Sequence, residues 1–299
     1  MTPPTGEQYE ITHGAYRAVV TQSGAALRLL THDGVDLVLG FPEDEIPHRC
    51  RGQMLMPWPN RIRDGRYTWN GVEEQLALTE PARDNAIHGL VRWATFAPVE
   101  RTASSITLGH RLMAQNGYPG ILDVSVTFAL DDGGLTITQA ATNIGSTSAP
   151  YASGSHPYLT LPSGRVDDWT LQAPAATLCL SDERLLPTGT RPVEDTEYDF
   201  RAGRRLGSLQ LDHCFADLAR DADGIATVRL SDDDSAVELW LDETQPWLMV
   251  FSDDGDGPSR EGVAVEPMTV PVDAFNTGEG VVELAPGASF SARWGIRVG

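Results

Sequence analysis

Apolar and polar residues alternate along most of the chain with a period of two. Residues 122–130 (LDVSVTFAL) place an apolar side chain at every second position, and the alternation resumes in LTITQAAT after Asp132-Gly133-Gly134. A period of two puts alternate side chains on opposite faces of a β-strand, and an Asp-Gly sequence between two such runs is typical of a hairpin turn. This region therefore predicts a β-hairpin.

The same unit recurs elsewhere in the sequence. Hairpins are predicted with turns at Asp33-Gly34, at Asn70-Gly71 and within the stretch Asp232–Ser235. Residues 290–298 again alternate and predict a closing strand. Many short strands, punctuated by 29 Gly and 20 Pro, are typical of an all-β sandwich or barrel.

Helical periodicity is nearly absent. We expect short helical turns near 258–262 or 272–276 and no long helix. The chain has 299 residues, a length that one β-sandwich reaches as a single unit, and it contains no internal repeat, low-complexity linker or shift in composition. Residues 1–299 are therefore expected to form one domain.

Charge and composition narrow the classes of partner. A net charge of −20 opposes binding to nucleic acid or to anionic membrane and favours a neutral small molecule. No apolar run approaches the ~20 residues needed to cross a membrane, and the first ten residues, MTPPTGEQYE, lack the features of a signal peptide. We expect a cytoplasmic protein. Its three scattered cysteines show no zinc-binding spacing and predict no structural disulfide in a reducing compartment.

Five segments interrupt the alternation with a polar or ionisable residue among apolar, Pro or Gly neighbours. They are residues 57–65, 85–90, 153–159, 211–218 and 264–276. In a β-sandwich such positions fall at strand ends or on an exposed face, where binding residues commonly lie. Within the last segment Glu266 stands out, because burying a carboxylate is costly unless it is paired or hydrogen-bonded. Taken singly, each polar residue also has an ordinary structural interpretation, such as a turn cap or a loop ion pair.

Seven short motifs, each weak alone, follow one another in a specific order. They are Asn60-Arg61-Ile62 with the hairpin after it, Asn85-Ala86-Ile87-His88-Gly89, Asn116-Gly117-Tyr118-Pro119-Gly120, Ser155-His156-Pro157-Tyr158, Asp212-His213-Cys214-Phe215, Glu266-Pro267 followed by Asn276, and Leu284-Ala285-Pro286-Gly287. In this order they resemble the aldose 1-epimerase (galactose mutarotase) family over most of the chain. Pro57-Trp58-Pro59 is similar to a bacterial mutarotase-like branch, which leaves the exact sugar open.

The resemblance implies a large two-sheet antiparallel β-sandwich with a cleft on one sheet, and neither a metal nor an organic cofactor. It implies a mutarotase that interconverts the α and β anomers of a free hexose such as glucose or galactose, with Glu266 as the base and His156 as the acid. A base removes the O1 proton while an acid protonates the ring oxygen, and a carboxylate and an imidazole suit these roles. We expect burial to raise the pKa of Glu266 and His156 to titrate near neutrality.

The resemblance further implies that Arg61, His88 and Asp212 hold the sugar, while Asn60 supports Arg61. His88 either donates to a ring hydroxyl or shares the acid role with His156. An aromatic platform beneath the sugar is expected from one of three candidates, Trp58, Tyr158 and Phe275. The expected partner is a monosaccharide, bound by a monomer or a homodimer.

Three other functions stay open at this stage. A hexose-6-phosphate epimerase would need additional cations near the site, and three arginines lie near the motifs, Arg63, Arg66 and Arg83. A non-catalytic carbohydrate-binding protein is the second alternative, which the presence of both Glu266 and His156 disfavours. A lyase or glycosidase on a related sandwich is the third.

Overall fold

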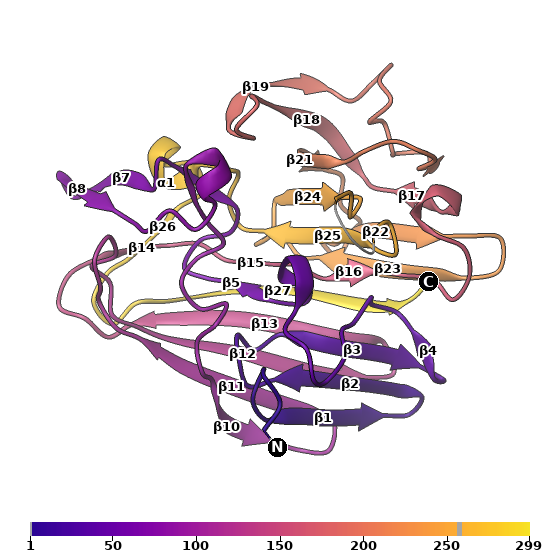
Figure 1. Cartoon of the computed structure of the whole chain (residues 1–299), viewed down its shortest axis with the longest axis horizontal. Coiled ribbons are helices and arrows are strands. Elements are labelled where there is room, and N and C mark those ends of the chain that lie inside the picture. Colours follow the sequence, from indigo (N-terminus) through magenta and orange to yellow (C-terminus); the bar gives the residue numbers. More distant parts are fainter. Residues whose placement is uncertain (1, 256–258) are drawn as a thin grey trace.

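The computed structural model describes residues 2–255 and 259–299 and consists mainly of antiparallel β-sheets (Figure 1). The largest sheet has nine strands, and its alternating residues face a common core. In spatial order its strands are β10 (Ala97–Arg101), β11 (Ser105–Leu112), β12 (Leu122–Asp131), β13 (Gly134–Asn143), β27 (Ser289–Val298), β23 (Ala236–Leu241), β22 (Ala226–Ser231), β17 (Thr170–Gln172) and β20 (Arg204–Arg205).

A second, eight-stranded sheet carries most of the residues discussed below. Its strands in order are β19 (Pro187–Pro192), β18 (Ala175–Ser181), β21 (Asp212–Leu218), β24 (Trp247–Phe251), β25 (Val263–Met268), β15 (Gly154–Ser155) and β5 (Met54–Leu55), with β16 (Tyr158–Leu159) also paired to β25. Alternate residues of both large sheets join one buried hydrophobic cluster, to which Val126, Trp294, Phe215 and Val265 belong. The fold is therefore an all-β sandwich.

Smaller elements surround this sandwich. The sheet β1–β4 packs through β1 and β2 against β11–β13, as the lower part of Figure 1 shows. The smaller strands are β1 (Gln8–His13), β2 (Tyr16–Thr21), β3 (Leu27–His32), β4 (Val35–Asp36), the pair β6 (Arg61–Arg63) and β9 (Asn85–Ile87), the pair β7 (Arg66–Trp69) and β8 (Val72–Gln75), and the pair β14 (Ala149–Tyr151) and β26 (Val282–Leu284). The helical turns are η1 (His48–Cys50), η2 (Pro81–Arg83), η3 (Val166–Asp168) and α1 (Ala274–Thr277).

The predicted hairpins are confirmed. Asp33-Gly34 and Asn70-Gly71 each join two paired strands, and all four residues have positive φ. Positive φ at both central residues defines the type I′ turn, whose twist matches that of the flanking strands and which Asn-Gly and Asp-Gly favour. The hairpin β12–β13 and the hairpin β22–β23 also form where predicted.

The helical expectation is confirmed in one of its two places. Helix α1 overlaps the predicted turn at 272–276. The other predicted turn, at 258–262, begins outside the described residues, and residues 259–262 are not helical. None of the helices in the described ranges is long and apolar enough to cross a membrane.

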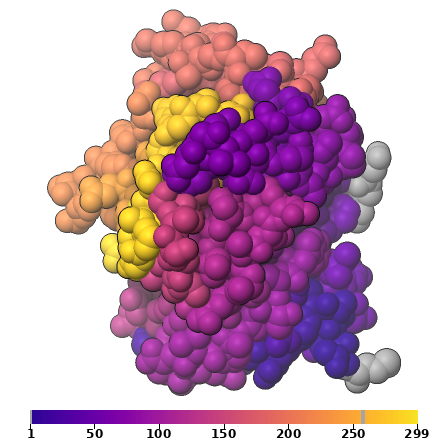
Figure 2. Space-filling model, turned by 90° about the vertical axis from the view of Figure 1, so that its left-hand side faces the viewer, coloured from indigo at the N-terminus to yellow at the C-terminus, as the bar shows by residue number. Residues whose placement is uncertain are grey.

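Two segments that interrupt the alternation, 211–218 and 264–276, contain regular central strands, β21 and β25. All six residues of β25 are buried. A strand covered on both faces has no polar face to alternate with its apolar one, so its sequence loses the period of two. The segment between β6 and β9 contacts helix α1 through β6 and β7, and the two regions lie against each other in Figure 2 (purple and yellow).

Candidate active site

A cavity of about 430 Å³ opens on the face of the eight-stranded sheet that points away from the sandwich core. Its volume falls in the range of small-molecule sites. It is lined by all six polar residues that the sequence singled out for catalysis or binding: Asn60, Arg61, His88, His156, Asp212 and Glu266. The fold thus brings together residues from the β6–β9 ribbon, the β15–β16 connection, β21 and β25.

Glu266 and His156 face each other inside the cavity. Glu266 Oε1 lies 3.4 Å from His156 Nε2, and the two residues are 2% and 6% exposed. Burial raises the pKa of Glu266 to about 8, with the Asp212 carboxylate acting in the same direction and Arg61 against it. Glu266 Oε2 is buried and has no hydrogen-bond partner among the described residues. The expectation of a raised pKa for this carboxyl is confirmed.

The expectation that His156 titrates near neutrality is wrong. Burial lowers the pKa of this imidazole to about 3, and the Arg92 and Arg61 guanidinium groups add to the effect by repelling an imidazolium. At neutral pH the free site therefore contains a protonated Glu266 carboxyl and a neutral His156 imidazole, so the one proton that the two groups can exchange resides on Glu266. A stacked aromatic ring fixes the imidazole, since Tyr158 lies parallel to it with ring centroids 5.2 Å apart.

His88 stands beside His156, with the two ring centroids 5.3 Å apart and nearly perpendicular. The backbone N–H of Asn60 donates a hydrogen bond to His88 Nδ1 (3.1 Å). Because burial lowers the pKa of His88 well below its ordinary value, the ring is neutral and its proton is on Nε2. His88 therefore offers a single N–H donor. Gly89, the next residue, packs closely against the backbone of Met56, since a Cβ at Gly89 would lie 2.1 Å from the Met56 carbonyl oxygen.

Arg61 is held rigidly on the opposite wall. Its Nε and Nη2 donate to the two carboxylate oxygens of Glu80 (2.9 and 3.0 Å), a paired geometry that fixes the guanidinium plane. Asn60 Oδ1 accepts from the backbone N–H and from Nη1 of Arg61. Arg61 Nη2 also lies 4.0 Å from Asp212 Oδ2, so the guanidinium lies between the carboxylates of Glu80 and Asp212.

Sequence reasoning did not find Glu80, which organises this wall. Besides Arg61, it accepts hydrogen bonds from Arg83 (3.0 Å) and Asn85 (3.1 Å). Burial opposes ionisation of this carboxyl, but these donors outweigh it and lower its pKa. In the sequence Glu80 is simply the residue before Pro81 in a polar turn, which gives no signal of its role.

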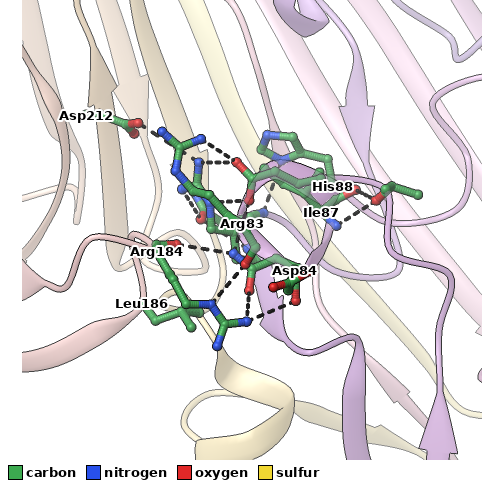
Figure 3. Close-up of polar contacts among 12 residues, drawn as sticks. Arg83, Asp84, Ile87, His88, Arg184, Leu186 and Asp212 are labelled. Atoms are coloured by element: carbon green, nitrogen blue, oxygen red, sulfur yellow. Dashed lines mark hydrogen bonds and ion pairs between the residues drawn. The ribbon is translucent and has the colours of Figure 1, made fainter.

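Arg184, from the loop between β18 and β19, fastens the same wall from outside. Its guanidinium donates to the backbone carbonyls of Arg83 and Asp84 and to the Asp64 carboxylate, at 2.7–3.0 Å (Figure 3). Asn85 donates back to the Arg184 carbonyl (3.2 Å). Two chain segments about 100 residues apart are thus joined by one side chain.

The aromatic candidates separate clearly. Tyr158 lines the cavity, and its hydroxyl donates to the Arg49 carbonyl (3.0 Å). Trp58 and Phe275 instead pack on each other in the hydrophobic core, with ring centroids 5.7 Å apart. Phe251 also lines the cavity, and the sequence offered no signal for it beyond strand alternation.

His88, His156 and Glu266 also form a donor set that could hold a metal ion. One donor atom from each lies within 4.8 Å of the others. Two imidazoles and a carboxylate are a common transition-metal combination. The same three groups equally provide a proton donor and acceptor for a bound organic molecule.

Comparisons with known proteins identify the class. The family model described as aldose 1-epimerase matches residues 7–297. The chain is 35% identical over 284 residues to the Escherichia coli protein "Uncharacterized protein YihR", covering 95% of this chain and 90% of that protein. It is 31% identical over 236 residues to the galactose mutarotase of Sus scrofa, covering 73% of this chain and 67% of that enzyme.

The fold agrees with these matches. The GalM/aldose epimerase homologue of C. elegans superimposes with a TM-score of 0.85 at 23% identity, covering 98% of this chain and 99% of that one. The protein is thus a carbohydrate epimerase, an isomerase with a galactose mutarotase-like fold. It belongs to the aldose 1-epimerase family.

Proposed function

We propose that this protein is a mutarotase that interconverts the α and β anomers of a free hexose such as glucose or galactose. The observation that carries the proposal is the buried Glu266–His156 pair, 3.4 Å apart, at the base of a cavity large enough for one sugar ring. Family membership supplies the reaction class, and the pair supplies the two proton-transfer groups that ring opening requires.

The chemistry follows from the proton count of the pair. Glu266 removes the proton from the O1 hydroxyl, and His156 delivers one to the ring oxygen O5. The C1–O5 bond breaks to give the open aldehyde, rotation about C1–C2 presents the other carbonyl face, and closure reverses both transfers. No net proton is gained or lost, so one shared proton suffices for a full cycle.

The shared proton must move within the pair before the sugar reacts. It lies on Glu266 in the free protein, because burial raises the pKa of that carboxyl to about 8. Sugar hydroxyls that donate hydrogen bonds to the carboxylate stabilise its charged form and lower that pKa. Binding therefore favours transfer of the proton to His156, which prepares the base and the acid together.

The remaining cavity residues are assigned to binding. The Arg61 guanidinium, fixed by Glu80, offers donors to neighbouring hydroxyls, and Asp212 accepts from a vicinal pair. His88 Nε2 donates to a ring hydroxyl or to O5. Tyr158 and Phe251 provide apolar surface for the C–H faces of the ring.

The charge of the cavity favours a free sugar over a 6-phosphate. Four arginines line it, but so do four carboxylates: Arg49, Arg61, Arg83 and Arg92 with Glu80, Asp212, Asp254 and Glu266. Arg61 and Arg83 are both bound to Glu80. Neither Arg63, which pairs with Asp273, nor Arg66, which contacts Gln75, lines the cavity. Although Glu266 is protonated in the free site, a phosphate dianion would meet arginines that already have partners, since Arg61 and Arg83 pair with Glu80 and Arg49 pairs with Asp253.

The direct test compares wild type with Glu266→Gln and His156→Asn. Polarimetry or exchange NMR on fresh α-glucose and α-galactose measures anomer exchange above the buffer rate, and both variants should lose about 10²–10⁴-fold in kcat while keeping wild-type circular dichroism. Glu283→Gln, on the exposed side of β26, is the matched control and should retain activity.

Near-wild-type rates in either variant would refute the assignment of the pair. Hexose 6-phosphates belong in the same substrate panel, and faster turnover of these than of free hexoses would favour the phosphosugar epimerase instead. Sugar binding by wild type with exchange at the buffer rate would indicate a carbohydrate-binding protein.

A further inference from the structure

A second, more apolar cavity of about 280 Å³ lies on the same face of the eight-stranded sheet and shares Asp212 with the sugar cavity. Three sulfur-bearing residues line it, Cys179 on β18, Cys214 on β21 and Met249 on β24. The proposed sugar chemistry uses none of them.

Strand register places these three residues in one row. Leu178 pairs with Phe215 in the antiparallel β18–β21 ladder, so the next position sets Cys179 opposite Cys214. In the neighbouring ladder Cys214 pairs directly with Met249. Residues opposite each other in a sheet present their side chains on the same face, within contact distance. The three sulfur-bearing side chains therefore form a transverse row across three adjacent strands.

The side chains of the row touch. Cys214 packs with Met249 and Met268 in a buried cluster, and Cys179 packs against its edge. The two thiols share a hydrogen bond, which lowers the pKa of Cys179 and raises that of Cys214. Cys214 is buried, whereas Cys179 is partly exposed at the cavity wall. A small ion entering the cavity therefore reaches both thiols and a thioether.

The donor atoms select the kind of ion. Thiolate and thioether sulfurs are soft ligands that favour Cu(I), whereas carboxylate and water oxygens suit hard cations. Among the described residues, the group of three clustered His, Cys, Asp or Glu donors is His88, His156 and Glu266. No carboxylate or imidazole thus joins Cys179 and Cys214 at comparable range in the described ranges, and the four-donor shell typical of structural Zn²⁺ is not formed there.

We propose that Cys179, Cys214 and Met249 form a binding site for a monovalent thiophilic ion, Cu(I). Binding replaces two S–H bonds by two Cu–S bonds and releases two protons to solvent, and copper stays in the +1 state. The bis-thiolate complex carries one negative charge, and the neutral Met249 thioether completes a three-sulfur shell. The site is independent of the proposed sugar reaction, so each proposal is tested without the other.

The experiment uses the full chain, reduced and kept anaerobic, and competes it for Cu(I) against the coloured chelator bicinchoninate. Wild type should withdraw one equivalent of copper. Cys179→Ser and Cys214→Ser should each weaken binding at least about 100-fold, and Met249→Leu about 10-fold. Cys50→Ser is the matched control, because Cys50 lies on η1 and hydrogen-bonds Arg92 instead. It should bind copper as wild type does.

Wild-type affinity in Cys179→Ser, or loss of binding in Cys50→Ser, would overturn the assignment. Equal or tighter binding of Zn²⁺ in place of Cu(I) would overturn the choice of ion. Cys179 lies partly exposed at the cavity wall, so its serine variant decides the question even if Cys214→Ser fails to fold.

Discussion

Replacing the proposed base, Glu266→Gln, should make the protein more stable at alkaline pH while removing its activity. The folded-state pKa of Glu266 is about 8, above its ordinary value of 4.5. The native protein therefore holds this proton more tightly than the unfolded chain. The stability that this proton confers is fully present below pH 4.5 and is lost as pH rises through about 8. Glutamine keeps the shape but cannot ionise, so it does not incur that loss.

The size of the effect follows from the shift. Each pKa unit corresponds to about 1.36 kcal/mol, so the free energy of unfolding of wild type should fall relative to the variant by about 4 kcal/mol between pH 5 and pH 9. An unfolding entropy of about 2.1 cal/mol/K per residue over 299 residues converts each kcal/mol to about 1.6 °C. The difference in Tm between variant and wild type should therefore grow by about 6 °C across this range.

Thermal melts followed by circular dichroism at pH 5, 7 and 9 measure this change. His156 is present in both proteins, so its own pH dependence cancels to first order. Glu283→Gln, an exposed carboxyl, should give the same small difference from wild type at every pH. A Tm difference for Glu266→Gln that is constant with pH, or that shrinks toward pH 9, would refute the reasoning that burial raises this pKa.

Two further predictions concern catalysis. The kcat/KM of wild type should stay level through neutral pH and fall about tenfold per pH unit above pH 8, because the Glu266–His156 pair loses its shared proton there. If kcat/KM instead rises up to pH 8 and then levels, ionised Glu266 acts without an acid from the pair. Glu80→Gln removes one charged partner of the Arg61 guanidinium and should raise KM about tenfold with little change in kcat, whereas Glu73→Gln, exposed on β8, should change neither in steady-state kinetics.

The sequence predicted the fold where local rules decide it. The Asp-Gly and Asn-Gly turns have positive φ, a conformation that these residue types favour. The alternation in β12 and β13 reflects one buried face. Both features can therefore be recognised from short stretches of sequence. The central strand β25 was less visible because both of its faces are covered and the alternation disappears, and β21 was less visible because its buried residues follow no period of two. Which face of a sheet carries a site depends on packing between distant segments, and no local pattern encodes that.

The candidate site divides in the same way. The six motif residues meet in one cavity as the order of motifs implied, although Asn60 and Glu266 are 206 positions apart. The partners that hold them were not visible. Arg184 acts through charged hydrogen bonds to a segment 100 positions away, and Glu80 through charged hydrogen bonds within its own part of the chain. In sequence both look like ordinary surface charges. The low pKa of His156 also depends on burial, which the His-Pro motif does not reveal.

The hydrogen bonds by which Arg184 holds the cavity wall have a consequence for how such a protein evolves. Glu266 belongs to a covered central strand where substitutions disturb the core, whereas Arg61, Glu80 and Arg83 belong to a short ribbon and turn fastened from outside by one arginine. Mutations in that ribbon alter the shape offered to a ligand and leave the backbone that carries Glu266 in place, although a change at Arg61 also shifts the pKa of the proton-transfer pair. A lineage built on this scaffold is therefore free to shift its ligand preference by changing the ribbon and the Arg184 loop while inheriting the same reaction.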